Sequence, residues 1–282
     1  MVKNRNILKV SKSIHTVEGA GVHLKRAFGN YNVNQLDPFL LLDDFHSGNP
    51  DDYMAGFPWH PHRGIETVTY MLNGKVKHED SIGNRGVIRS GDIQWMTAGS
   101  GIIHSEMPQK TEGVLRGLQL WVNLPASHKM MNPRYREVLS TQIPELILTN
   151  GTKIKIISGE IEGTRGPVKD IMVDIVYLDI SIPAGANFEM PVKEEYTAFS
   201  YLLEGNGYFS GDSKSKIEAD HLVIFDKGDF VSVTAGDISL HFLFLAGKPL
   251  HEPIAWQGPI VMNTEEELEK AFIEYQNGTF IK

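Results

Sequence analysis

Two histidines with a strand-like spacing form the first chemically suggestive pattern in the chain. His60 and His62 lie in the stretch FPWHPHRGIET, residues 57–67, with Pro61 between them. Residues i and i+2 of an extended strand project from the same face, so both imidazoles are expected to point to one side. One such pair is more often a surface or hydrogen-bonded feature than a metal site. A metal interpretation therefore needs further donors elsewhere in the chain.

A second pair with the same spacing supplies such donors. His104 and Glu106 lie in GSGIIHSEMP, residues 99–108. If the two strands lie side by side, three imidazoles and one carboxylate converge, and this donor set suits a divalent first-row metal such as Fe, Mn, Ni, Cu or Zn. Glu66 is the alternative carboxylate, but a strand places it roughly 13 Å beyond His62. Glu106 is therefore favoured, and Glu66 is expected to hold an imidazole N–H.

The composition limits the classes of protein and partner. The chain has 282 residues, no cysteine and a formal net charge of −8. Disulfides and thiolate zinc sites are therefore excluded, and a direct nucleic-acid partner is not expected. The sequence shows neither an apolar signal segment nor a run of about 20 apolar residues. We therefore expect no membrane association and predict a cytoplasmic location.

Short apolar runs separated by turn residues dominate the chain from about residue 20 to residue 250. This pattern predicts an all-β protein. YMLNG resembles YLLEG further along the chain, and SGDIQWM resembles ADHLVIF, which indicates two related barrels built from a duplicated unit. The stretch NLPASHKMMNPRY interrupts the strand pattern. Two domains are therefore expected, covering residues 1–135 and 136–282.

Helical patterning is confined to two segments. Residues 127–138 are a candidate short helix. Near the C-terminus, Thr264 and Glu267 have the spacing of a capping box, and an apolar face begins at Leu268. A helix over residues 264–277 is therefore expected at the end of the second domain.

The second half lacks the metal donors of the first. Aligning YMLNG with YLLEG places Pro191 and Lys193 opposite the first histidine pair. Residues 229–234, which fall opposite the second pair, contain neither His nor Glu. We therefore predict a metal site in the N-terminal barrel and none in the C-terminal barrel.

These stretches together resemble the pirin family of cupin proteins. HPHRG at residues 60–64 and GDIQWMTAGSGIIHSEMP at residues 91–108 are similar to the two metal-binding motifs of that family. LDPFLLLDDF at residues 36–45 and PLHEPIAWQGPIVMNT at residues 249–264 extend the likeness. The resemblance implies an all-β bicupin with two tandem cupin-type β-barrels and a short C-terminal helix. It also implies one mononuclear metal, usually Fe(II), bound by the residues that match His60, His62, His104 and Glu106.

The resemblance implies two classes of function. Some pirin-like proteins resemble quercetin 2,3-dioxygenases, which open a flavonol ring with O₂. Carried over, this implies an oxidoreductase whose partners are a flavonol-like aromatic substrate and O₂, with Glu106 as the candidate base. Other relatives are described as partners of transcription factors or metabolic enzymes. The alternative is therefore a redox- or metal-responsive regulatory protein with a protein partner and no physiological catalysis, and a third is an inactive storage or scaffold cupin.

Several side chains near the ligand strands have two interpretations, first as core residues and second as the wall of a substrate pocket. They are Phe45, His46, Trp59, His78, Trp95 and Met96. Arg63 directly follows the first histidine pair. We expect Arg63 to point away from the metal and to form a structural ion pair.

Overall fold

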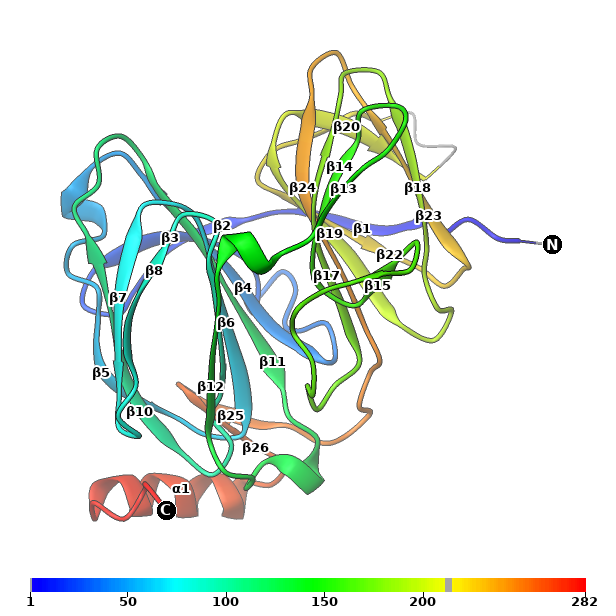
Figure 1. Cartoon of the computed structure of the whole chain (residues 1–282). Helices are drawn as coiled ribbons and strands as arrows, with labels where there is room; N and C mark the ends of the chain where they lie inside the picture. Colours follow the sequence, from blue (N-terminus) through cyan, green and yellow to red (C-terminus); the bar gives the residue numbers. More distant parts are fainter. Residues whose placement is uncertain (1, 211–214) are drawn as a thin grey trace. The chain divides into compact units, whose positions relative to one another are not determined.

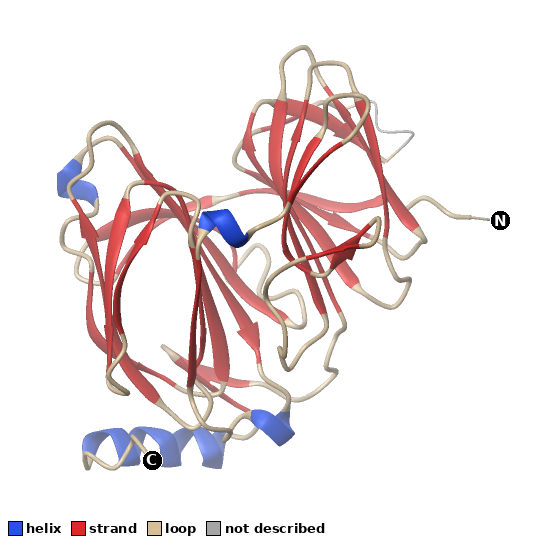
Figure 2. Ribbon diagram, in the orientation of Figure 1, coloured by secondary structure: helices blue, strands red, loops and turns tan. Residues whose placement is uncertain are grey.

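The computed structural model describes residues 2–210 and 215–282 of the chain. Most of the regular structure in these residues is strand, and the helices are few and short (Figure 2). The chain divides into two compact units. The N-terminal unit contains Ile14–Gly29, Phe39–Ser140 and Leu250–Lys282, and the C-terminal unit contains the residues up to Ser13, Asn30–Pro38 and Thr141–Pro249.

The N-terminal unit is built from a seven-stranded sheet in the order β12-β9-β6-β11-β4-β3-β2 and a four-stranded sheet in the order β5-β10-β7-β8. All neighbouring strands in both sheets pair antiparallel. The strand bounds are Ile14–Glu18 (β2), Val22–Phe28 (β3), Phe39–Ser47 (β4), Phe57–His62 (β5), Ile65–Asn73 (β6), Lys75–Asp80 (β7), Arg85–Arg89 (β8), Ile93–Thr97 (β9), Ile102–Gln109 (β10), Leu115–Asn123 (β11) and Arg134–Val138 (β12).

The C-terminal unit has the same arrangement, with a seven-stranded sheet in the order β1-β22-β19-β24-β17-β14-β13 and a four-stranded sheet in the order β18-β23-β20-β21. A two-stranded hairpin, β15-β16, is separate. The strand bounds are Ile7–Lys12 (β1), Glu145–Ile147 (β13), Lys153–Ser158 (β14), Glu160–Ile161 (β15), Thr164–Arg165 (β16), Ile175–Ile182 (β17), Asn187–Pro191 (β18), Thr197–Glu204 (β19), Asn206–Phe209 (β20), Ile217–Glu218 (β21), His221–Phe225 (β22), Phe230–Ala235 (β23) and Leu240–Gly247 (β24).

The two strand orders correspond position by position, as expected for a duplicated unit. The stretches YMLN and YLLE lie in β6 and β19, which occupy the same place in their sheets. The stretches IQWMT and HLVIF form β9 and β22, which also correspond. In the described residues each unit has, apart from a two-stranded hairpin, two separate sheets. The barrels expected from the sequence therefore take the form of two-sheet sandwiches.

The ends of the chain depart from the two continuous halves that the sequence suggests. The first strand, β1, pairs antiparallel with β22 and completes the large sheet of the C-terminal unit, where β12 takes the corresponding edge in the N-terminal unit (Figure 1). The last segment contains the hairpin Ala255–Gln257 (β25) and Ile260–Met262 (β26) and the helix Glu265–Gln276 (α1). It belongs to the N-terminal unit, because its apolar side chains pack together and against Ile103 of β10.

The C-terminal helix has the predicted start, and the other predicted helix is wrong. In α1 the backbone N–H of Glu267 donates to Thr264 Oγ1 at 3.2 Å, and the Glu267 carboxylate accepts from the backbone N–H of Thr264 at 3.3 Å. Residues 127–138 do not form a helix: a 3₁₀ turn at Ala126–His128 is followed by β12, which pairs with the free edge of β9. No helix in the described part of the chain is long and apolar enough to cross a membrane.

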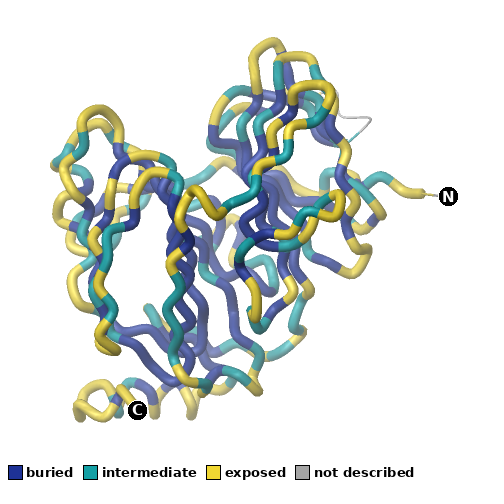
Figure 3. Tube along the Cα trace, in the orientation of Figure 1, coloured by how far each residue is buried: buried dark blue, intermediate teal, exposed yellow. Residues whose placement is uncertain are grey.

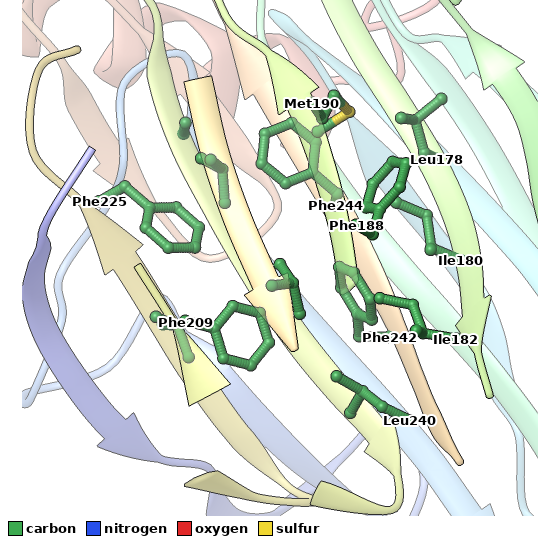
Figure 4. Close-up of a cluster of buried hydrophobic side chains, with 14 of the residues drawn as sticks. Leu178, Ile180, Ile182, Phe188, Met190, Phe209, Phe225, Leu240, Phe242 and Phe244 are labelled. Atoms are coloured by element: carbon green, nitrogen blue, oxygen red, sulfur yellow. The ribbon is translucent and has the colours of Figure 1, made fainter. Parts of the chain in front are cut away.

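Buried strand residues form the core of each unit, while exposed residues gather at loops and outer faces (Figure 3). The core of the C-terminal unit is rich in aromatic side chains, among them Phe209, Phe225, Phe242 and Phe244 (Figure 4). Burial of each such ring contributes about 1.5–3 kcal/mol. The sandwich therefore holds the strands in a fixed register, and that register places the functional side chains.

Candidate metal centre

Antiparallel pairing of β5 and β10 brings the two histidine-containing stretches together. The ladder sets His104 opposite His60 and Ile102 opposite His62. The imidazole centroids lie 4.4 Å apart for His60 and His104, 5.0 Å for His62 and His104, and 4.8 Å for His60 and His62. One ring nitrogen from each residue lies within 4.8 Å of the others. Three imidazoles therefore form a group that could hold a metal ion.

Backbone carbonyls determine which nitrogen of each β5 histidine faces the group. His60 Nδ1 lies 2.7 Å from the carbonyl oxygen of Pro58, and His62 Nδ1 lies 3.1 Å from that of Pro259. A carbonyl oxygen only accepts hydrogen bonds, so both Nδ1 atoms carry the hydrogen of the neutral ring. The two Nε2 atoms, which are 3.1 Å apart, then face each other with lone pairs. Two nitrogen atoms that bind one metal ion at right angles to each other, each with a bond of about 2.1 Å, lie about 3.0 Å apart, which is close to the separation of these Nε2 atoms.

His104 gives a second indication that the site fits a cation. Its side chain is fully buried, and neither ring nitrogen has a hydrogen-bond partner among the described residues. A buried polar atom left unsatisfied costs about 1–3 kcal/mol. Burial, together with neighbouring imidazoles, holds the pKa of His104 well below its usual value, and the same causes lower the pKa of His62. Both rings are therefore neutral at pH 7, which is the form that binds metals.

Glu106 lies beside this group, one step further along β10. The register shifts between His104 and Glu106, and Glu106 stands opposite His78 of β7. Its carboxylate accepts hydrogen bonds from Thr69 Oγ1 at 2.8 Å and from Gln119 Nε2 at 2.7 Å. Glu106, His104 and His78 form a second group of candidate donors. Because His104 belongs to both donor groups, Glu106 lies next to the group of three imidazoles.

His78 was considered for the pocket wall, but it lies among the candidate metal donors. The side chain is fully buried, and its Nε2 lies 3.2 Å from Asp80 Oδ2. Its ring stacks on Tyr135 at a centroid distance of 4.9 Å. His78 Nδ1 has no hydrogen-bond partner in the described structure. Two overlapping donor groups that share His104 are therefore present.

Glu66 and Arg63 lie outside both donor groups and form contacts of their own. Glu66 does not hold an imidazole: its Oε1 accepts a 2.6 Å hydrogen bond from Thr97. Burial raises the pKa of Glu66, since the charged form loses solvation. The prediction for Arg63 is confirmed, because it forms a 2.7 Å ion pair with Glu274 and donates to the carbonyl oxygen of Phe280. These contacts attach β5 to the C-terminal segment.

The candidate pocket residues fall into different places. Phe45, Trp95 and Met96 are buried, with Met96 and Phe45 in two separate core clusters. His46 is exposed near the end of β4. Of the residues considered for a pocket wall, Trp59 lines the cavity beside the histidines and is half exposed.

A cavity of about 580 Å³ opens onto His60 and His62. Its wall includes Gln119, Trp121 and Trp256, which the sequence analysis did not single out. Trp121 contacts His62 edge to face at a centroid distance of 5.0 Å. Gln119 and Trp121 are two residues apart in β11, so strand alternation could have placed both on one face. Trp256 comes from the C-terminal segment, and no local pattern connects it to the site.

Two corresponding sandwiches, with overlapping histidine and carboxylate donor groups in the N-terminal one, define a bicupin whose candidate metal donors, among the described residues, lie in one unit. The particular family follows from comparison with known proteins. The family model described as Pirin matches residues 21–122, and the model described as Pirin C-terminal cupin domain matches residues 177–281. The chain belongs to the pirin family, as the sequence motifs predicted.

Individual relatives cover nearly the whole chain. A pirin-like protein of Caulobacter vibrioides is 46% identical over 277 residues, which are 98% of this chain and 99% of that protein. A Pseudomonas aeruginosa protein, described as a candidate quercetin 2,3-dioxygenase, is 42% identical and covers 99% of both chains. The crystal structure of quercetin 2,3-dioxygenase from Acinetobacter baumannii is 32% identical, with a TM-score of 0.91 over 99% of both chains.

Proposed function

We propose that the N-terminal unit is a metal-dependent dioxygenase of the quercetin 2,3-dioxygenase type. In this proposal one divalent ion is held by His60, His62, His104 and Glu106. Fe(II) is the expected ion, and Mn, Ni, Cu and Zn are also compatible with these donors. The observation that carries the proposal is the pair of Nε2 atoms, 3.1 Å apart, of two histidines that line a 580 Å³ cavity.

The cavity has the size and lining for a flat aromatic substrate. Small-molecule sites commonly have volumes of about 300–1,000 Å³. The indoles of Trp59, Trp121 and Trp256 offer faces and edges to an aromatic ring system. The proposed partners are therefore a flavonol-like molecule and O₂, in agreement with the activity named for two similar proteins.

A divalent ion, when bound, acts as a Lewis acid that favours an ionised substrate hydroxyl and, if redox-active, supplies O₂ chemistry. Glu106 is the proposed base that accepts the proton of that hydroxyl, since its carboxylate is buried beside His104. Thr69 and Gln119 orient the carboxylate through their hydrogen bonds. The tryptophans hold the substrate and exclude water from the reacting face.

The proposal is tested by turnover of quercetin. The protein is loaded with Fe(II) without oxygen, desalted and mixed with quercetin under air, and the loss of flavonol absorbance and the release of CO are followed. Metal-dependent loss of quercetin with CO release is expected, and the His104→Ala variant should show none. Bound metal without turnover would remove the enzyme assignment. The regulatory alternative, its protein partner and the cytoplasmic location stay predictions from the sequence.

A further inference from the structure

The C-terminal unit contains a larger cavity in the place that corresponds to the substrate cavity of the N-terminal unit. Its volume is about 1020 Å³, and its wall is formed by β14, β17, β18, β24 and the segment 159–174. The 580 Å³ cavity is lined by β3, β4, β5 and β11. These four strands occupy the same positions in their sheets as β14, β17, β18 and β24. The duplicated fold has therefore kept a cavity at the same site in both units.

The cavity of the C-terminal unit lacks the donors for a comparable metal site. The wall residues that the structure describes include Pro191 and Lys193, the positions aligned with the histidine pair of β5, and none of these wall residues is a histidine. The apolar part of the wall includes Phe188, Met190 and Phe244, all buried and close together (Figure 4). The cavity is therefore suited to binding a small molecule without the help of a metal ion.

Charge and hydrogen bonding restrict the ligand. Six carboxylate side chains and three basic side chains line the cavity, so an anionic ligand would meet a net repulsion. One of the basic groups, Lys193, is paired with Asp174 at 3.0 Å and with Tyr196 Oη at 2.8 Å. Tyr196 also donates to Asp174. This cluster therefore places polar atoms beside the apolar residues of the wall.

We propose that the cavity of the C-terminal unit binds a largely apolar small molecule that carries no negative charge. Its apolar body lies against Phe188, Met190 and Phe244, and its polar group faces Lys193 and Tyr196. The volume is at the upper end of the range of about 300–1,000 Å³ that small-molecule sites commonly have. This site is separate from the proposed metal centre and does not depend on the dioxygenase activity.

Fluorescent probes of different charge test the proposal in the full chain. The uncharged probe is N-phenyl-1-naphthylamine, and the anionic one is 1-anilinonaphthalene-8-sulfonate. The blocking variant is Val176→Trp, at a half-buried wall position of this cavity. The matched control is Ala20→Trp, at an exposed wall position of the other cavity. Val176→Trp should weaken binding of the uncharged probe by roughly tenfold or more, because the indole occupies the ligand volume.

The control variant should retain the affinity of the wild-type protein for the uncharged probe, and the anionic probe should bind more weakly. Unchanged binding in Val176→Trp, loss of binding in Ala20→Trp, or preference for the anionic probe would overturn the proposal. Hydrogen exchange of the wild-type protein provides a test that needs no variant. The uncharged probe should slow exchange in residues 159–174 and 187–193. Protection confined to residues 57–62 would place the probe in the other cavity and contradict the proposal.

Discussion

Gln119 donates a 2.7 Å hydrogen bond from its Nε2 to Oε2 of Glu106. The amide oxygen of Gln119 in turn accepts the indole N–H of Trp121 at 3.2 Å, which fixes the orientation of the amide. The other carboxylate oxygen of Glu106 is held by Thr69 at 2.8 Å. Three side chains from two strands therefore determine how the proposed carboxylate ligand is presented to the histidines.

Gln119→Ala should weaken metal binding without removing a ligand. Loss of a partner that orients a ligand typically lowers metal affinity by about 10–100-fold. Competition with a chelator measures this change. The matched control is Gln109→Ala, at an exposed position of β10, which should bind the metal as the wild-type protein does. Equal affinities in both variants would mean that Gln119 does not position Glu106.

Arg63→Ala should destabilise the N-terminal unit. Arg63 is 2% exposed and connects Glu274 with the carbonyl oxygen of Phe280. Glu274 keeps some access to solvent, so the loss of this charge-assisted hydrogen bond should cost about 1.5–3 kcal/mol. Lys282 contacts the same Glu274 from the surface at 2.9 Å, and Lys282→Ala should cost at most about 1 kcal/mol. Urea unfolding curves compare the two, and similar losses would contradict a structural role specific to Arg63.

The stability of the metal-free protein should fall as the pH decreases below about 6.5, the usual pKa of histidine. His62 and His104 have pKa values well below that, mainly because they are buried. Below pH 6.5 the unfolded chain therefore binds protons that the folded chain does not, and this favours unfolding. Each histidine contributes up to about 1.4 kcal/mol per pH unit.

Unfolding midpoints of the metal-free protein between pH 7.5 and 5.5 check this expectation. The His104→Gln variant loses one of the two buried imidazoles, so its stability should depend less on pH than that of the wild-type protein. A wild-type stability that stays constant or increases as the pH falls, or the same slope in both proteins, would show that these rings are accessible to protons in the folded state.

The features that sequence reasoning placed correctly depend on local spacing. The strand period of two predicted that His60 and His62 share a face, and antiparallel pairing of β5 with β10 brings His104 to them. The capping box at Thr264 and Glu267 is a similarly local signal. The family motifs lie on β4, β5, β9, β10 and the hairpin β25-β26, all in the N-terminal unit, and the resemblance that they carry added the bicupin fold.

Other features depend on pairing between distant parts of the chain, which leaves no periodic signal. The carbonyl oxygen of Pro259 orients His62 from 197 residues further along the sequence. Strand β1 forms the edge of the large C-terminal sheet by pairing with β22, which lies far along the chain. Residues 134–138 have the sequence RYREV, whose charged side chains do not alternate clearly with apolar ones. Their strand conformation comes from pairing with β9.

Metal content of histidine variants tests the proposed centre most directly. Wild-type protein, His60→Ala, His104→Ala, His78→Ala and His46→Ala are incubated with Fe(II) without oxygen, desalted and measured for bound metal, with folding checked by circular dichroism. We predict about one ion per chain in the wild-type protein, His78→Ala and His46→Ala, and almost none in folded His60→Ala and His104→Ala. Metal-free wild-type protein, or loss of metal in His78→Ala with retention in His60→Ala, would contradict the proposed ligand set.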